Sequence, residues 1–195
     1  MKIVIASDNQ HKLIEIKQML APLGLKIITK AEAGITAEVE ETGLTFADNA
    51  LLKAREISLT TGLCAIADDS GIAVDALDGA PGVFSARYAA TDELRNQKLL
   101  HNLKDIKDED RTAQYVCAIT FYIPTGENFT VLGKCDGIIT HSPEGQNGFG
   151  YDPIFFCREY NKTYACLTPE QKNKISHRGK ALARFSEILT GYIAP

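Results

Sequence analysis

The stretch KIVIASDNQHKLIEIKQML, residues 2–20, sets the class of fold because its pattern changes within a few residues. Its first part, Lys2–Ser7, is a short apolar run rich in β-branched residues, which is typical of a strand buried on both faces. From Asn9 onward the apolar residues recur at helical spacing, with Asp8 or Asn9 as the N-cap. A buried strand followed at once by a helix predicts an α/β fold.

The same alternation continues through the first half of the chain. Leu25–Thr29 and Cys64–Asp68 are predicted strands, and between them a helix begins after Thr45 and stops at Gly62. Thr91 is the predicted cap of a third helix. These elements predict strands that alternate with helices, as in a parallel part of a sheet.

The middle of the chain has a different pattern. Strict alternation of apolar residues over 113–123 predicts a half-buried strand, and the turn residues PTGEN with the run 129–132 predict a hairpin. The charged run before it, 104–111, is expected to be a solvated loop, and 176–192 is a predicted helix. Together these elements favour a mixed sheet with helices on both faces.

Length and composition set limits on the class of protein. The chain has 195 residues, 45% of them hydrophobic and 24% charged, which is ordinary for a soluble domain, and no run approaches a membrane span. The short apolar start, without a cleavage site, predicts a cytoplasmic protein. The net charge of −4 argues against a broad nucleic-acid surface. Five cysteines without a C-x-x-C pair predict reduced core thiols.

Two acidic pairs, EETG at 40–43 and DDSG at 68–71, are candidate metal ligands. A few carboxylates from separate segments suit Mg²⁺ when phosphate oxygens complete its shell. The DDSG pair is the stronger signal, because it follows the apolar run CAIA and two ionised carboxylates there are costly without a cation. The EETG pair alone is equally typical of a solvated turn.

Three other segments combine polar side chains with turn or cap residues. SDNQHK at 7–12 lies where a strand meets a helix N-terminus, which favours an anion, although ordinary capping is the alternative. GFGYD at 148–152 brackets an aromatic ring with glycines, as in a site for a flat ligand or in a simple hairpin turn. SHRGKAL at 176–182 places His177 and Arg178 at a helix start, where they oppose the dipole and suit an anionic or carbonyl ligand; a solvated helix start is the alternative.

In this order, SDNQHKLIEIK, EETGLTFADNALLKA, AIADDSGIAVDALDGAPGVFSARY, GFGYDPIFF and SHRGKAL closely resemble the inosine triphosphate pyrophosphatase family, in particular its bacterial dITP/XTP pyrophosphatase branch. The resemblance covers nearly the whole chain. It implies one α/β domain over 1–195, an elongated mixed β-sheet with flanking helices, and two lobes with the active site in the cleft between them. It also implies a homodimer and Mg²⁺-dependent hydrolysis of dITP, ITP, XTP and dXTP to monophosphate and pyrophosphate, which keeps these nucleotides out of DNA and RNA.

The family's residues, transferred to matching positions, imply a phosphate and metal site in the first part of the chain. Asp69 would be the general base and, with Glu40, a ligand of Mg²⁺; Glu41 replaces Glu40 if the register differs by one, and Asp68 would support the pair. The triphosphate would be bound by Ser7, Asp8, Asn9, Gln10, His11, Lys12, Lys53 and Ser70. The family's usual opening is Thr-Gly-Asn, so Asp8 adds a carboxylate near the expected phosphates.

The same transfer implies a purine pocket made by Phe149, Gly150, Tyr151, Asp152, Lys172, His177 and Arg178. Such a pocket would select the 6-oxo acceptor and N1–H donor of hypoxanthine and xanthine, since adenine reverses both groups and would leave buried polar groups unpaired. Two alternatives stay open: the same reaction on modified pyrimidine triphosphates, and a nucleotide sensor without turnover.

Overall fold

The computed structural model describes residues 2–193 of the chain. Its strands form one seven-stranded sheet with the order β2-β1-β3-β4-β5-β6-β7. The strands are β1 (Lys2–Ile5), β2 (Lys26–Thr29), β3 (Cys64–Val74), β4 (Thr112–Tyr122), β5 (Asn128–Ile139), β6 (Phe155–Cys157) and β7 (Lys162–Thr163). The pairs β1–β2 and β1–β3 are parallel, whereas β5–β6 and β6–β7 are antiparallel. The predicted mixed α/β sheet is therefore confirmed.

The helices begin and end where the local signals predict. The α-helices are α1 (Gln10–Leu20), α2 (Phe46–Thr61), α3 (Asp92–Asn102), α4 (Pro169–Ile175) and α5 (His177–Ile193). Asn9 caps α1, Thr45 and Asp48 form a capping box on α2, and Gly62 ends α2 in the left-handed region. The short helix α4 is an element that the sequence analysis did not predict.

Strand β3 is longer than predicted. The sequence pattern predicts its end at Asp68, but the strand continues without a break to Val74. Gly71 is required here because a Cβ at this position would overlap Ser85 and the Gly82 carbonyl oxygen. The acidic pair is thus in the body of a buried strand, and the glycine permits a close approach rather than a turn.

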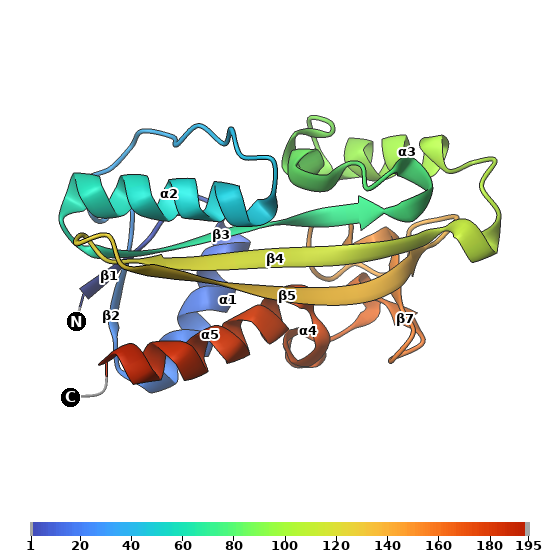
Figure 1. Ribbon diagram of the computed structural model, residues 1–195. Helices are drawn as coiled ribbons and strands as arrows, with labels where there is room; N and C mark the ends of the chain where they lie inside the picture. The colour runs from blue at the N-terminus through green and yellow to red at the C-terminus, as the bar shows by residue number, and fades with distance from the viewer. Residues whose placement is uncertain (1, 194–195) are drawn as a thin grey trace. The chain divides into compact units, whose positions relative to one another are not determined.

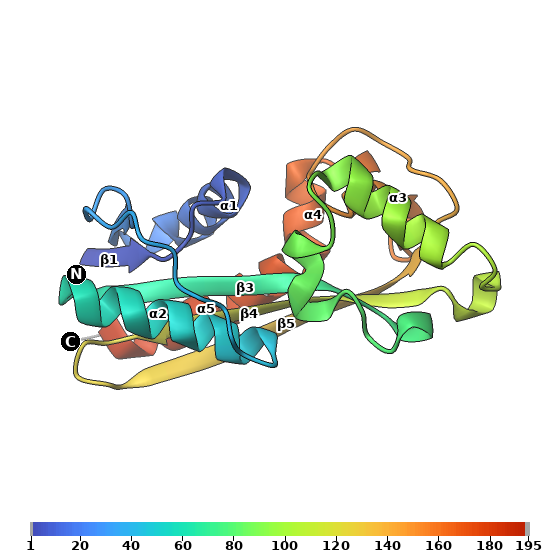
Figure 2. The same cartoon turned by 90° about the horizontal axis from the view of Figure 1, so that it is seen from above.

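By their internal contacts the residues fall into two compact units, and β3, β4 and β5 contribute residues to both. Unit 1 comprises Met1–Asp69, Cys117–Gly133 and Lys180–Pro195. In unit 1 one apolar cluster joins β1 to α1 and α5, and a second joins β1 to α2. The two clusters lie on opposite faces of the sheet, as Figures 1 and 2 show with α2 on one face and α5 on the other.

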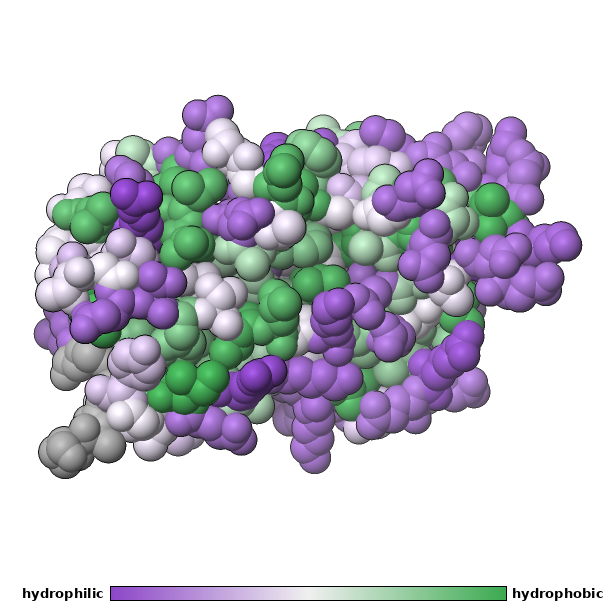
Figure 3. All heavy atoms as spheres, in the orientation of Figure 1, coloured by the Kyte–Doolittle hydropathy of each residue, from purple (hydrophilic) through white to green (hydrophobic). Residues whose placement is uncertain are grey.

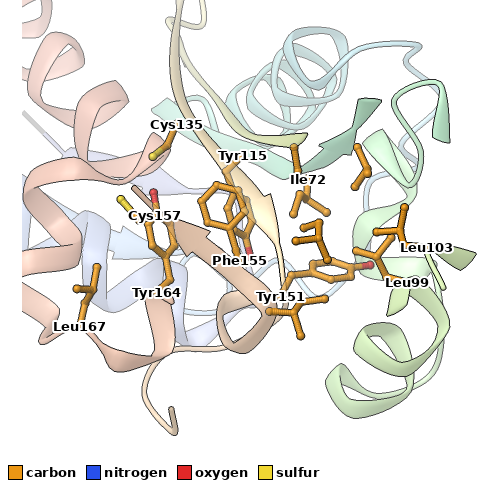
Figure 4. Packing of buried hydrophobic residues seen from close by; sticks show 14 of the residues in the cluster. Ile72, Leu99, Leu103, Tyr115, Cys135, Tyr151, Phe155, Cys157, Tyr164 and Leu167 are labelled. Atoms are coloured by element: carbon orange, nitrogen blue, oxygen red, sulfur yellow. The ribbon is translucent and has the colours of Figure 1, made fainter. Parts of the chain in front are cut away.

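Unit 2, which comprises Ser70–Val116 and Lys134–Gly179, has an aromatic core. The ring of Tyr115 packs edge-on against Phe155 at 4.6 Å and stacks on Tyr164 at 5.7 Å between centroids. Figure 4 shows these rings together, with Tyr151 beside Leu99 and Leu103. Large, well-packed rings of this kind contribute strongly to a core.

Two predictions about buried groups need correction. The run 104–111 is not wholly a solvated loop, because Arg111 is only 1% exposed and donates to three backbone carbonyls. All five cysteines are free as predicted, but Cys166 is exposed and is therefore not a core thiol. The burial of Arg111 has no local signal, since it depends on backbone carbonyls that are distant in the sequence.

Among residues 2–193, no helix combines the length and the apolar composition that crossing a bilayer requires. On the face that Figure 3 displays, hydrophobic side chains gather at the centre and left among hydrophilic ones, and hydrophilic side chains dominate the right.

Replacing Arg111 by Met is expected to destabilise the fold. The guanidinium satisfies the carbonyl oxygens of Leu103, Ile139 and Thr140 at 2.6, 2.8 and 2.7 Å, and Met satisfies none of them. Since each unpaired buried acceptor costs about 1–3 kcal/mol, the free energy of unfolding should fall by more than about 2 kcal/mol. Urea unfolding measures this loss, with exposed Lys107→Met as the control. Equal stability of the two variants would contradict the structural role of Arg111.

Candidate functional site

The acidic pair on β3 is the centre of a charged cluster in unit 1. Asp68 and Asp69 are 1% and 7% exposed. Asp68 forms an ion pair with Lys12, and its other carboxylate oxygen accepts a hydrogen bond from the Cys117 thiol at 2.8 Å. The carboxylate of Asp68 is therefore engaged on both sides by protein groups, which fits the supporting role expected for it.

Asp69 has a different environment. Its Oδ1 lies 3.3 Å from the ammonium of Lys53, which also contacts Glu41 Oε1 at 2.7 Å and the Asp68 carbonyl oxygen at 2.9 Å. Burial raises the pKa of the Asp69 carboxyl above its usual value, although Lys53 and Lys12 oppose the rise. Burial lowers the pKa of Lys53, but the charges of Asp69 and Glu41 outweigh it and hold that pKa above its usual value. One cation thus joins the two carboxylates.

The two neighbouring glutamates of EETG have unequal environments. Glu41 is half-buried and forms the contact with Lys53, whereas the side chain of Glu40 is exposed. Glu41 is the alternative to Glu40 if the register differs by one residue. It is Glu41 that shares the Lys53 ammonium with Asp69. This geometry favours Glu41 over Glu40 as the second carboxylate of the site.

The donor set suits a cation that needs few protein ligands. Among residues 2–193 there is no group of three or more His, Cys, Asp or Glu side chains that could hold a metal ion. However, Asp69 Oδ2 is buried and has no hydrogen-bond partner among the described residues. A carboxylate oxygen of this kind, on a residue that shares the Lys53 ammonium with Glu41, fits Mg²⁺, which takes one or two carboxylates and completes its shell with water and phosphate.

The loop 7–12 forms the predicted cap of α1. Asn9 Oδ1 accepts the Lys12 backbone N–H at 3.2 Å, and the Asn9 N–H donates to Ser7 Oγ at 3.2 Å. Gln10 and His11 are exposed in the first turn of the helix. This strand-to-helix junction retains the helix N-terminus and a lysine, which together favour an anion.

In unit 2, Asp152 is the centre of a second cluster. Its Oδ2 accepts from Lys172 Nζ at 2.6 Å and from the Phe149 backbone N–H at 2.8 Å, and both charged side chains are buried. Gly148 has φ +77, and a Cβ there would overlap the Asp152 carboxylate. The loop therefore needs this glycine to bring Phe149 and Lys172 to one carboxylate.

Two cations lie near the ring of Phe149. Lys172 Nζ lies 4.8 Å and Arg178 Cζ lies 5.8 Å from the centre of the Phe149 ring. Arg178 also donates to Ser70 Oγ at 2.8 Å. The structure thus brings together predicted residues that are far apart in the sequence, and it places cationic donors beside an aromatic face.

His177 is held by a residue that the sequence analysis did not single out. Its ring stacks on Tyr115 with centroids 4.4 Å apart and planes 3° apart, and the Tyr115 hydroxyl lies 3.5 Å from Asp152 Oδ1. Burial raises the pKa of Tyr115 well above its usual value, so its hydroxyl stays neutral. Tyr115 therefore supports both His177 and Asp152.

Two predicted pocket residues serve the loop differently from the prediction. The ring of Tyr151 is 4% exposed in the core of unit 2, where its hydroxyl donates to the Ser85 carbonyl oxygen at 2.9 Å, so it does not project as a pocket wall (Figure 4). Gly150 is held through its backbone: its N–H donates to Asp92 at 2.7 Å, and its carbonyl oxygen accepts from Asn96 at 3.1 Å. The start of α3 thus fixes the loop 148–152.

Sequence reasoning missed several residues that complete these clusters. They are Lys30, Asp92, Asn96, Tyr115 and Cys117. Tyr115 and Cys117 have only the alternation of a strand as a signal, and that pattern is equally typical of core residues. The N-terminal position of Asp92 in α3 is a capping signal, not a ligand signal.

Comparison with known proteins gives the family. The model of the Ham1 family matches residues 3–188. A protein of Photorhabdus laumondii named dITP/XTP pyrophosphatase is 50% identical over 194 residues, covering 96% of this chain and 98% of the relative. A protein of Bacillus subtilis with the same name is 46% identical over 189 residues, covering 95% and 96%. The resemblance found in the sequence is thereby confirmed.

Solved structures agree with these relatives. The HAM1 protein of Coxiella burnetii is 45% identical and superposes with a TM-score of 0.92, over 98% of this chain and 99% of the other. A nucleoside-triphosphatase, dITP/XTP pyrophosphatase, of Mycobacterium abscessus is 48% identical with a TM-score of 0.80, over 95% and 98%. Since sequence and fold agree over nearly the whole length, this chain belongs to the Ham1 family.

Proposed function

We propose that the chain is a nucleoside-triphosphate pyrophosphatase that hydrolyses dITP, ITP, XTP and dXTP to the monophosphate and pyrophosphate. The observation that carries this proposal is the buried pair Asp68–Asp69 between Lys12 and Lys53, in a chain about half identical to proteins named dITP/XTP pyrophosphatase. Two cations beside two buried carboxylates suit a reaction that brings a charged triphosphate to a general base.

Mg²⁺ is part of the proposal, with Asp69 and Glu41 as its protein ligands. The buried Asp69 Oδ2 without a hydrogen-bond partner among the described residues supports this choice. When bound, Mg²⁺ neutralises triphosphate charge and lowers the pKa of coordinated water. The Lys53 ammonium contacts the carboxylates of both Glu41 and Asp69 and so limits the repulsion between them.

Asp69 is proposed as the base. Its carboxylate takes a proton from the water whose oxygen attacks the α-phosphorus, and the bond from that phosphorus to the bridging oxygen breaks, which releases pyrophosphate. A pKa raised by burial makes the carboxylate a stronger base than an exposed aspartate. Lys12 and the N-terminus of α1 stabilise the charge on the phosphates.

Recognition of the base is proposed for unit 2. Phe149 offers a ring face for stacking, and the cations Lys172 and Arg178 are donors that suit a 6-oxo group. Adenine presents a 6-amino donor instead, so it would leave these donors unpaired. Removal of deaminated purines from the nucleotide pool is the role that follows from such selectivity. The homodimer and the cytoplasmic location stay predictions.

A panel of triphosphates tests the proposed activity. With Mg²⁺, pyrophosphate should appear from ITP, dITP and XTP at a kcat/KM at least about 100-fold above that for ATP, as unpaired buried groups cost about 1–3 kcal/mol each. Modified pyrimidine triphosphates belong in the same panel. Preference for ATP would contradict the proposal, preference for a pyrimidine would move it to another substrate class, and intact ITP recovered from a stable complex would indicate a sensor.

The variant Asp69→Asn tests the base. Loss of the carboxylate should reduce kcat for ITP about 100-fold or more, because the amide cannot accept the proton at neutral pH. Circular dichroism should show the same folded state, and Asp105→Asn, an exposed substitution, is the matched control. Retention of more than about a tenth of the activity would remove Asp69 from this role.

The neighbours Glu41 and Glu40 can be separated by matched substitutions. Since Glu41 shares Lys53 with Asp69, Glu41→Gln should raise the Mg²⁺ concentration for half-maximal activity at least about tenfold more than Glu40→Gln does. Titration of activity with Mg²⁺ at saturating ITP measures the difference. The reverse order of the two variants would return the ligand role to Glu40.

A further inference from the structure

Lys30 is a buried cation to which the proposed function gives no role. It is 6% exposed, its Nζ lies 2.5 Å from Asp8 Oδ2, and it donates to the Ala37 carbonyl oxygen at 3.1 Å. Lysine is rarely buried unless it is paired, because its ammonium loses hydration. The Asp8 carboxylate and the Ala37 carbonyl oxygen are thus the partners of its buried ammonium.

The fold places Lys30 beside the loop 7–12. It follows β2 directly, and its backbone N–H donates to the Ile5 carbonyl oxygen at 3.1 Å, at the end of the parallel neighbour β1. Asp8 comes three residues after Ile5 and immediately before the cap of α1. The ion pair thus joins the ends of two adjacent strands at the strand-to-helix junction.

The charge of Asp8 is unfavourable for the ligand proposed for this loop. A carboxylate at the N-terminus of α1 competes with phosphate for the same positive end of the helix and repels it. The Asp8 side chain is 61% exposed, so water screens the pair and its contribution to stability is small. The pair does change the net charge at the N-terminus of α1, where the phosphates are proposed to bind.

We propose that Lys30 is a positioning residue for the loop 7–12, the phosphate loop. Lys30 holds the Asp8 carboxylate and cancels its charge, so that the loop can accept a polyphosphate. Asp8 then acts through Lys30 and not by contact with the substrate. This inference rests on the proposed function for the identity of the ligand. The charge that Lys30 balances is that of Asp8.

A double-mutant cycle tests this proposal in the full chain. The variants are Lys30→Gln, Asp8→Asn and the double variant, with Lys26→Met, which replaces an exposed lysine at the start of β2, as the control. Glutamine is uncharged and one atom shorter than lysine but keeps a side-chain N–H donor, so the fold should be retained. KM and kcat for ITP with Mg²⁺ are measured, and the Kd of inorganic tripolyphosphate is measured by calorimetry.

Lys30→Gln should raise KM and the tripolyphosphate Kd about tenfold with kcat changed less than about twofold, because an uncompensated carboxylate then faces the phosphates. Removing that carboxylate in the double variant should recover most of the loss, and the loss should shrink at high salt. Lys26→Met should leave all three constants near those of the unsubstituted chain.

A double variant that binds no better than Lys30→Gln would overturn the proposal, as would a tenfold higher KM for Asp8→Asn alone, which would indicate direct contact of Asp8 with substrate. Failure of the proposed function is distinguishable: if the unsubstituted chain does not hydrolyse ITP, the tripolyphosphate cycle alone decides the role of Lys30. Recovery in that cycle supports it, and no recovery overturns it.

Discussion

The placement of two adjacent carboxylates inside a buried strand is the constraint on which the rest of unit 1 depends. Asp68 and Asp69 cannot both stay ionised at this depth without nearby cations. Lys12 comes from the start of α1 and Lys53 from the middle of α2, so a helix on each face of the sheet contributes one cation. The same helices form the two apolar clusters of unit 1, and the core therefore fixes the distances between the charges.

In unit 2 the main feature is the loop 148–152, which contacts from several elements hold in place. The loop is fixed by α3 through the backbone of Gly150, by α4 through Lys172, and by β4 through Tyr115. The Phe149 ring then lies 4.8 Å from Lys172 Nζ and 5.8 Å from Arg178 Cζ, within the range of cation–π attraction. Rigid support from three elements suits recognition of a base, because a loosely held loop discriminates poorly.

Structural features that depend on residues close together in the sequence could be predicted from it. Helix ends at Asn9, Thr45 and Gly62 follow from capping chemistry within a few residues. The charged residues at the centre of each cluster, among them Asp69 and Asp152, follow from the family resemblance. Partners that are distant in the sequence could not be predicted. Ser70 and Gly71 have the local preference of a turn but lie in a strand, since the reason for the glycine is the segment at Ser85. The pairing of Lys12 with Asp68 has no local signal.

One rule of charge balance explains both the expected and the unexpected parts of the phosphate loop. The buried carboxylates of β3 are acceptable because lysines lie beside them, and Asp8, at a position where the family commonly has glycine, is acceptable because Lys30 lies beside it. A lone carboxylate at an anion-binding helix N-terminus would oppose the function of the loop. The same carboxylate with a buried lysine leaves the charge of the loop unchanged. A departure from a family's sequence pattern in a binding loop is therefore best judged together with the residue that compensates it in space.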